Sequence, residues 1–232
     1  MVFNAIPSPF VAAELARAIP LRHSVRRFAA GIDADHAAAL RRLVSAANSA
    51  GGRNMRLVTD EPTAFSWLGS YGFFRGVTGY VVVAGPNGDA DLDIRAGFWG
   101  EAVVLAAVAM GLATCWVGAT YRHSAVKGGA DTVDERVVAC IALGMPSAAQ
   151  SERTVVANDA ADWFQRGVEA ASIAPSAYAR RGWSFERHGN EAVCIPARRR
   201  RLFGGFEQVD AGIAALHFLL ASNHPVRVSL HI

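Results

Sequence analysis

At 232 residues, the chain is long enough to bury a sizeable core, as one large domain or as two small ones. A hydrophobic fraction of 52% against a charged fraction of 19% argues against a disordered chain. The formal net charge of +3 is compatible with an anionic small ligand and is weak support for nucleic-acid binding.

The first half of the chain mixes helical and extended patterns. Residues 10–19 predict a short helix with Ser8 as its cap and Pro9 at its first position. Residues 33–48 carry apolar side chains at helical spacing and predict an amphipathic helix. Residues 61–79 are rich in glycine and predict irregular structure. Apolar runs bounded by glycine or charged residues predict strands at 55–59, 80–84 and 136–143.

The stretch around which the chain is organised covers residues 98–119. Up to Met110 it is almost wholly apolar, with Glu101 as its one charged residue. A helix that is apolar on all sides is either a membrane span or buried in a large core. We favour the buried helix, because Glu101 interrupts the run early and Gly111 fits a C-terminal cap with positive φ. Residues 113–117 then predict a short buried strand.

The second half begins near Ser147 and continues the same mixture. Helices are predicted at residues 159–171 and 207–222. Residues 184–187 and 191–196 predict a hairpin that turns at Gly189 and Asn190. Alternating residues at 226–232 predict a terminal strand. Strands interspersed with helices indicate an α+β or mixed α/β domain, with neither a strict internal repeat nor a low-complexity linker.

One basic motif, RHSVRRF, stands directly before the predicted helix at 33–48. Arginines present a planar fork that suits phosphate, and serine adds a neutral donor. If this segment is extended, Arg22, Ser24 and Arg26 share one side. Taken alone, the motif is more typical of a solvated basic turn than of a phosphate site. His23, which has no serine–histidine–aspartate pattern around it, is more typical of a hydrogen-bond donor than of a catalytic base.

Other familiar chemistries lack their motifs. No G-x-S-x-G surrounds Ser176, and no G-x-G-x-x-G opens a helix after a strand. The three cysteines are widely spaced and odd in number, which argues against a metal site and against a disulfide framework, and favours a cytoplasmic protein. The N-terminal residues lack the pattern of a signal peptide. The basic run at 198–201 indicates a solvated face or an arm that lies on the core, and nucleic-acid binding there is a weaker alternative.

Four stretches, in this order, resemble motifs of the nitroreductase superfamily of flavin enzymes. They are most similar to its fused branch, in which one chain supplies the parts that two subunits otherwise share. The stretches are RHSVRRF at 22–28, GLATCWVG at 111–118, APSAYARRGWSF at 174–185 and VDAGIAALHF at 209–218.

The resemblance implies an α+β fold with a mixed sheet around a long central apolar helix and two similar lobes. Residues 1–150 would form the N-terminal lobe, and residues 151–232 would complete a flavin site. A non-covalent FMN would lie between the lobes, so that the flavin carries the chemistry and few reactive side chains are needed. NADH or NADPH would supply hydride, and the acceptor would be a nitroaromatic compound or a quinone. One chain would form a pseudo-dimer, so the protein would be a monomer or a weak homodimer. Neither a nucleic acid nor a membrane would be a partner.

Individual roles follow from the same resemblance. The cationic motif would hold the phosphate and ribityl chain and reach the pyrimidine edge. Backbone at the end of the second motif would face the ring, with the Gly118 N–H near the reactive N5 nitrogen. The third motif would cover the ring, and Arg153 is a weaker phosphate candidate. The implied cofactor-binding residues are Arg22, His23, Ser24, Arg26, Trp116, Val117, Gly118, Ala119, Arg153, Pro175, Ser176, Ala177 and Arg181.

The chain departs from the family in the third motif. Ala179 replaces an asparagine, and Arg181 and Gly182 replace a glutamine–proline pair. The loss of an amide would cost about 1–2 kcal/mol of flavin binding unless Arg181 replaces it. Two functions therefore remain open, an FMN-dependent oxidoreductase and a non-catalytic protein that binds or sequesters flavin.

Overall fold

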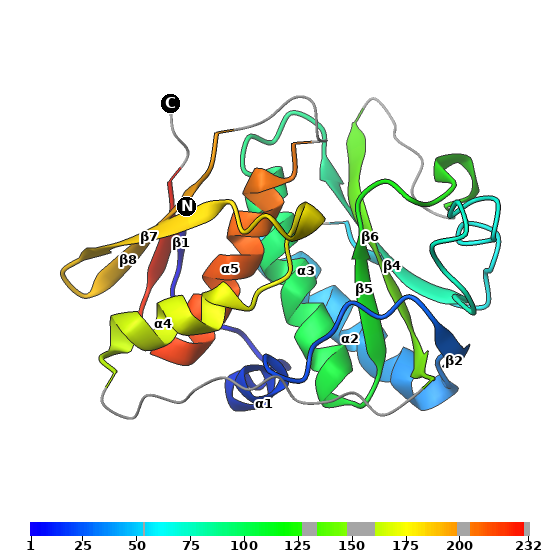
Figure 1. Cartoon of the computed structure of the whole chain (residues 1–232), viewed down its shortest axis with the longest axis horizontal. Coiled ribbons are helices and arrows are strands. Elements are labelled where there is room, and N and C mark those ends of the chain that lie inside the picture. The colour runs from blue at the N-terminus through cyan, green and yellow to red at the C-terminus, as the bar shows by residue number, and fades with distance from the viewer. Residues whose placement is uncertain (53, 127–133, 148–160, 199–204, 230–232) are drawn as a thin grey trace.

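The chain folds into two β-sheets that lie on opposite sides of a pair of helices (Figure 1). Helix α3 spans Leu92–Ala109 and helix α5 spans Glu207–Ser222. This arrangement confirms the α+β class. The residues described in the computed structural model are 1–52, 54–126, 134–147, 161–198 and 205–229.

The larger sheet has five strands, and every pairing in it is antiparallel. The apolar runs that predicted β4 and β6 form its centre, where side chains alternate between the α3 side and the outer side. Strand β2 is too short to carry a periodic signal and was not predicted. The strands are β2 (Phe28–Ala30), β3 (Arg56–Val58), β4 (Gly79–Pro86), β5 (Ala113–Val117) and β6 (Glu135–Pro146).

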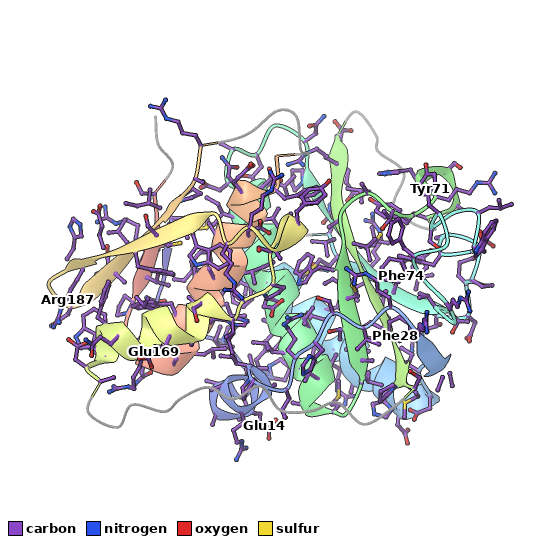
Figure 2. The ribbon with its side chains drawn as sticks, in the orientation of Figure 1. Glu14, Phe28, Tyr71, Phe74, Glu169 and Arg187 are labelled. Atoms are coloured by element: carbon purple, nitrogen blue, oxygen red, sulfur yellow. The ribbon has the colours of Figure 1, made fainter. Side chains whose placement is uncertain are left out.

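Aromatic side chains cover the outer side of this sheet. Phe28 and Phe74 are buried there, and the Phe74 ring meets Phe65 edge-on at 5.6 Å between centroids (Figure 2). Tyr71, from the same glycine-rich segment, points into solvent. The segment predicted to be irregular thus closes a second apolar cluster rather than lying free on the surface.

The smaller sheet has four strands in the order β1-β9-β8-β7. Strands β7 and β8 form the predicted hairpin, in which Gly189 takes the positive φ of 61° that the turn requires. Residues 230–232 of the predicted terminal strand lie outside the described residues, and β1 was not predicted. The strands are β1 (Val2–Phe3), β7 (Trp183–His188), β8 (Glu191–Pro196) and β9 (Val226–Val228).

Helices α3 and α5 cross with their backbones in contact. A Cβ at Gly97 would lie 2.0 Å from the backbone oxygen of Val209, and one at Gly212 would lie 2.1 Å from that of Ile94. Gly97 lies against Val209, three residues before Gly212, and Gly212 lies against Ile94, three residues before Gly97. The contact is therefore reciprocal. Only glycine permits this approach, so these two positions fix how the helices pack.

Helix α3 is buried at every residue except Arg95 and Ala109. It starts earlier than predicted, because Asp93 and Arg95 are accommodated by ion pairs with Arg136 and Asp89. At the far end, Gly111 has the predicted positive φ, of 86°. None of the helices in the described part of the chain is both long and apolar enough to cross a membrane.

The remaining helices pack around this pair. Helix α2 (Ala34–Gly51) is capped by Asp33 and ends at Gly52, and α4 (Trp163–Ser172) begins with a capping box formed by Asp162 and Gln165. Helix α1 (Ala12–Ala18) corrects a prediction: Val11 precedes it without a side-chain cap, so the helix begins after Ser8 and Pro9 rather than at them.

Candidate active site

A cavity of about 420 Å³ opens beside the end of β5. Small-molecule sites commonly have volumes of about 300–1,000 Å³. Its walls come from the segment after α1, the end of β5, the loop between α4 and β7, and the start of α5. The structure thus brings together stretches that are far apart in the sequence. The sequence-predicted residues that line it are Ser24, Arg26, Trp116, Val117, Gly118, Ala119, Pro175, Ser176 and Ala177.

Four residues of the predicted set are placed differently. Arg22, His23 and Arg181 are not among the residues that line the cavity. Arg153 lies outside the described residues. Of these four, Arg22 has the most informative surroundings.

The segment after Arg22 runs beside β5 in an extended conformation. The Val25 N–H donates to the Thr114 oxygen at 2.9 Å, and Ser24 bridges to the same strand residue. Alternate residues of an extended chain share a side, so Ser24 and Arg26 both reach the cavity. The Arg22 N–H instead donates to the Ala18 oxygen at 3.0 Å, as in a helical turn. The Arg22 side chain reaches the Ser24 hydroxyl at 3.4 Å, but unlike Ser24 and Arg26 it is not among the residues that line the cavity.

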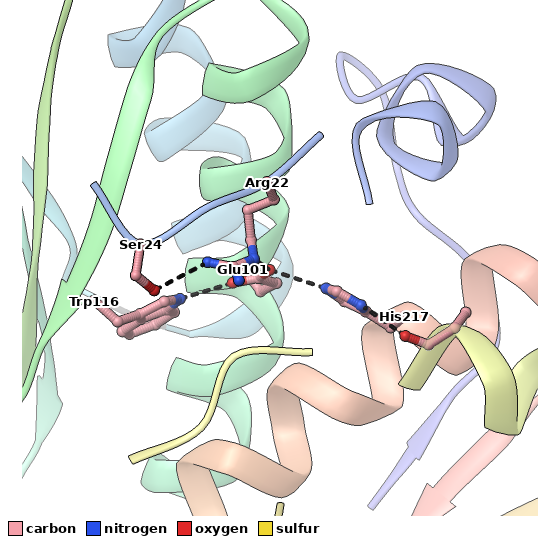
Figure 3. A network of polar contacts seen from close by, with 6 residues as sticks. Arg22, Ser24, Glu101, Trp116 and His217 are labelled. Atoms are coloured by element: carbon pink, nitrogen blue, oxygen red, sulfur yellow. Dashed lines mark hydrogen bonds and ion pairs between the residues drawn. The ribbon is translucent and has the colours of Figure 1, made fainter. Parts of the chain in front are cut away.

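A buried polar network surrounds the Arg22 side chain (Figure 3). Glu101 of α3 is its centre and is completely buried. The Trp116 indole N–H donates to Glu101 Oε2 at 2.7 Å, and His217 Nε2 lies 2.9 Å from Glu101 Oε1. Arg22 Nε lies 3.8 Å from the same Oε1, and Arg22 Nη1 donates to Ser24 Oγ at 3.4 Å.

The partners of His217 fix its hydrogen bonding. Its Nδ1 lies 3.2 Å from the Ala170 oxygen, which only accepts, so Nδ1 carries a proton and donates it. The contact between Nε2 and Glu101 then holds one further proton, on the imidazole or on the carboxyl. The Arg22 guanidinium is a further buried neighbour of this carboxyl, at 3.8 Å. A buried cation is costly unless it is paired, so Glu101 is the group that allows Arg22 to be buried.

The network ends on the cavity at two points, Trp116 and Ser24, which both line it. Arg22 is thus separated from the cavity by its own partners. Its position indicates a role in holding the cavity wall rather than in direct ligand contact.

A family model described as "Putative TM nitroreductase" matches residues 14–222 of this chain. The chain belongs to this family. No curated protein matches the sequence.

Solved nitroreductases have similar folds. One from Thermotoga maritima is 20% identical, covers 94% of this chain and 88% of its own, and has a TM-score of 0.60. An NADH dehydrogenase/NAD(P)H nitroreductase from Parabacteroides distasonis is 18% identical over 64% of this chain and 96% of its own, with a TM-score of 0.50. A nitroreductase from Desulfovibrio desulfuricans, solved with FMN, is 19% identical over 60% and 90%, with a TM-score of 0.47. At these identities the likeness to the first two structures shows the fold alone.

The cavity of this nitroreductase-family chain contains one thiol, that of Cys115, among its described residues. Burial raises the pKa of Cys115, and the nearby Arg26 and Arg22 only partly offset that effect. A thiol with a raised pKa stays protonated at neutral pH and is a poor nucleophile. Cys115 is therefore a packing residue, in keeping with chemistry that does not use a protein nucleophile.

The loop that covers the cavity is held in a strained conformation. Tyr178, Ala179 and Arg181 all have positive φ, of 56°, 55° and 47°. Such residues cost energy and persist where the surroundings enforce them, often at functional sites. Ser176 is part of the restraint, because its Oγ accepts the Arg181 N–H at 2.9 Å. Ser176 thus shapes the loop, as expected from the absence of a nucleophile motif around it.

Sequence reasoning missed several residues of the cavity wall. Phe73 and Phe74 come from the segment predicted only to be irregular, and Phe206 directly precedes α5. Asp210 is an acidic residue inside the apolar stretch VDAGIAALHF, and that isolation was a usable signal. Phe206 had no such signal, because its contact with Gly118 joins distant parts of the chain.

Proposed function

We propose that this chain is an FMN-dependent oxidoreductase that passes hydride from NADH or NADPH to an electron-poor acceptor such as a quinone or a nitroaromatic compound. The supporting observation is one cavity that combines apolar walls with Ser24 and Arg26 in a member of a nitroreductase family. Bound FMN would supply the hydride chemistry. The protein's own residues would bind the FMN, orient it and shield it.

The residues present fit that cofactor. Arg26 and Ser24 offer a guanidinium and a hydroxyl to an anionic phosphate. Val117, Pro175 and Ile213 give the apolar surface that a planar ring requires. At Gly118 a Cβ would lie 2.5 Å from the Phe206 ring, so glycine lets this ring pack directly against the backbone of the wall. Such a wall excludes water from the reacting atoms.

The buried network has a supporting part in this proposal. Glu101 holds the Trp116 indole, and Arg22 holds the Ser24 hydroxyl, so two residues of the wall are fixed from behind. Groups that are already held in place bind a ligand without a further ordering cost. Arg22 therefore contributes to flavin binding through Ser24 rather than through the phosphate.

The altered third motif is the reason to consider a non-catalytic flavin protein. Ala179 and Arg181 are exposed and are not among the cavity-lining residues. Arg181 thus does not replace the missing amide in the described wall, and turnover has to separate this alternative from the enzyme. We also propose that one chain is a complete unit, because the reciprocal crossing of α3 and α5 joins its two halves internally.

The test is the visible spectrum of the purified protein, followed by FMN titration and by NADH or NADPH oxidation with menadione. A yellow protein that turns over supports the proposal. A yellow protein without turnover supports the flavin-sequestering alternative. A protein that stays colourless with excess FMN overturns both.

A further inference from the structure

Asp210 is a buried acid in the cavity wall. It stands in the first turn of α5, is 7% exposed, and lines the cavity together with one other charged residue of the described chain, Arg26. The flavin-binding role proposed above does not use it. An ionisable group in a mostly apolar pocket is expensive to bury, so its hydrogen bonds decide its state.

The carboxyl of Asp210 has few donors for its two oxygens. Both accept from the single Ala177 N–H, at 3.0 and 3.1 Å. A carboxylate can accept about four hydrogen bonds, so one shared N–H leaves it undersupplied. Ala177 belongs to the strained loop, which places the carboxyl at the junction of the loop and α5.

The charged groups around Asp210 do not supply the missing donors. Glu207 lies one turn earlier on α5 and opposes ionisation. Arg180, Arg198 and Glu207 line a second recess that shares Asp210 with the cavity, and Arg26 lines the cavity itself. Among the described residues, no ion pair joins Asp210 to these arginines.

The ionisation of Asp210 follows from this environment. Burial, with a further contribution from Glu207, raises its pKa to about 7, against the lowering effect of the Ala177 hydrogen bond. Below that pH the group is a neutral acid with an O–H donor. Above it the group is an anion in an apolar pocket.

We propose that neutral Asp210 donates a hydrogen bond to a carbonyl or nitro oxygen of the acceptor, so that this residue selects uncharged, oxygen-bearing aromatic acceptors. The inference rests on the proposed function, since it names how that site recognises its acceptor. An oxygen of a quinone is an acceptor only, and it matches an O–H donor and not a carboxylate. Once Asp210 is ionised, its oxygens repel that same ligand oxygen.

The binding experiment uses FMN-loaded protein without a nicotinamide, so that no turnover occurs. Menadione affinity is measured by equilibrium dialysis from pH 5.5 to 8.5. We expect binding about tenfold tighter at the acid end, with the change centred near pH 7. The matched ligand, 2-methylnaphthalene, has the same rings without oxygens and is expected to bind independently of pH.

Two variants sharpen the result. Asp210→Asn keeps a donor and is expected to bind menadione at every pH about as tightly as the wild type does at pH 5.5. Glu207→Gln is the control: it keeps the pH dependence but moves its midpoint to lower pH, because Glu207 opposes ionisation of Asp210. If Asp210→Asn retains the wild-type pH profile, the proposal is wrong.

An NMR titration of ¹³C-labelled aspartate carboxyls gives a readout that does not depend on any variant. A ligand that prefers the neutral acid raises the pKa of Asp210, so saturating menadione is expected to shift that titration to higher pH. An unshifted titration overturns the proposal. FMN titration is run in parallel, because absence of flavin binding would refute the proposed function while leaving the Asp210 titration interpretable.

Discussion

Two buried carboxyl groups, Glu101 and Asp210, lie on the two helices that cross at Gly97 and Gly212. Glu101 is surrounded by donors from Trp116 and His217 and by the charge of Arg22. Asp210 has one backbone N–H and faces a cavity. The contrast shows that burial alone does not assign a role to an acid. The supply of compensating partners separates a group that fastens the fold from one that is available to a ligand.

The largest expected effect comes from replacing Glu101, the acid with more hydrogen-bond and charged partners. Glu101→Gln leaves Arg22 and His217 buried without an anion and is expected to lower the free energy of unfolding by about 3–5 kcal/mol. Urea denaturation measures it. The matched control is Glu135→Gln, which breaks a partly exposed pair with Arg56 and is expected to cost about 1 kcal/mol or less. Equal losses in the two variants would contradict the assigned role of Glu101.

Replacement of Asp210, the acid with few donors, is expected to raise the free energy of unfolding rather than lower it. The pKa of Asp210 is higher in the folded chain than in the unfolded one, so its contribution to stability is full below about pH 4 and is lost as pH rises through 7. Asp210→Asn removes that loss and is expected to stabilise the protein at pH 8 by about 4 kcal/mol. The difference is expected to disappear near pH 4. Denaturation curves at both pH values test this, and a destabilised variant at pH 8 would refute it.

Arg26 is the other charged residue that lines the cavity, and its replacement tests ligand binding rather than stability. Arg26 is exposed and carries no described role in the core, so Arg26→Ala is expected to weaken FMN binding by roughly 10–100-fold without lowering stability. Arg27→Ala is the matched control, since Arg27 is exposed but does not line the cavity. Fluorescence titration with FMN measures both. An unchanged dissociation constant in Arg26→Ala would remove that residue from the site.

The smallest expected effect falls where the network meets the cavity. Ser24→Ala removes a neutral donor and a long hydrogen bond from Arg22, and is expected to weaken FMN binding by about fivefold. Stability is expected to change by about 0.5 kcal/mol or less, because Ser24 is exposed. The same two measurements apply. A loss of stability as large as that of Glu101→Gln would place Ser24 inside the network rather than at its edge.

The sequence predicted elements whose signal is local and missed those that depend on distant partners. The long apolar run, the glycine after it and the turn at Gly189 define α3, β5 and the hairpin by composition and periodicity alone. Strands β1 and β2 have two and three residues and exist because another strand pairs with them. Helix α3 begins before the apolar run because ion pairs with Asp89 and Arg136 accommodate its charged first turn.

The site residues also divide into those that a local motif indicates and those that depend on distant partners. Motifs found by resemblance placed the segment around Ser24, the end of β5 and the loop at Pro175 in one cavity wall. The partner of Arg22 was not predictable, because Glu101 is far away in the chain and only the packing of α3 brings it near. Asp210 stood out by its apolar neighbours, but its undersupplied carboxyl depends on the loop at Ala177.

The backbone contact between α3 and α5 also fixes the breadth of the slot that a ligand enters. Val209, which touches Gly97, is the immediate neighbour of Asp210, while the far end of α3 leads into β5 on the opposite wall. Where Gly97 and Gly212 meet the opposite backbone, no side chain separates the two helices, so the start of α5 is held at a fixed distance from α3. In the proposed flavin site, a wall fixed in this way would suit a flat aromatic ligand better than a bulky one.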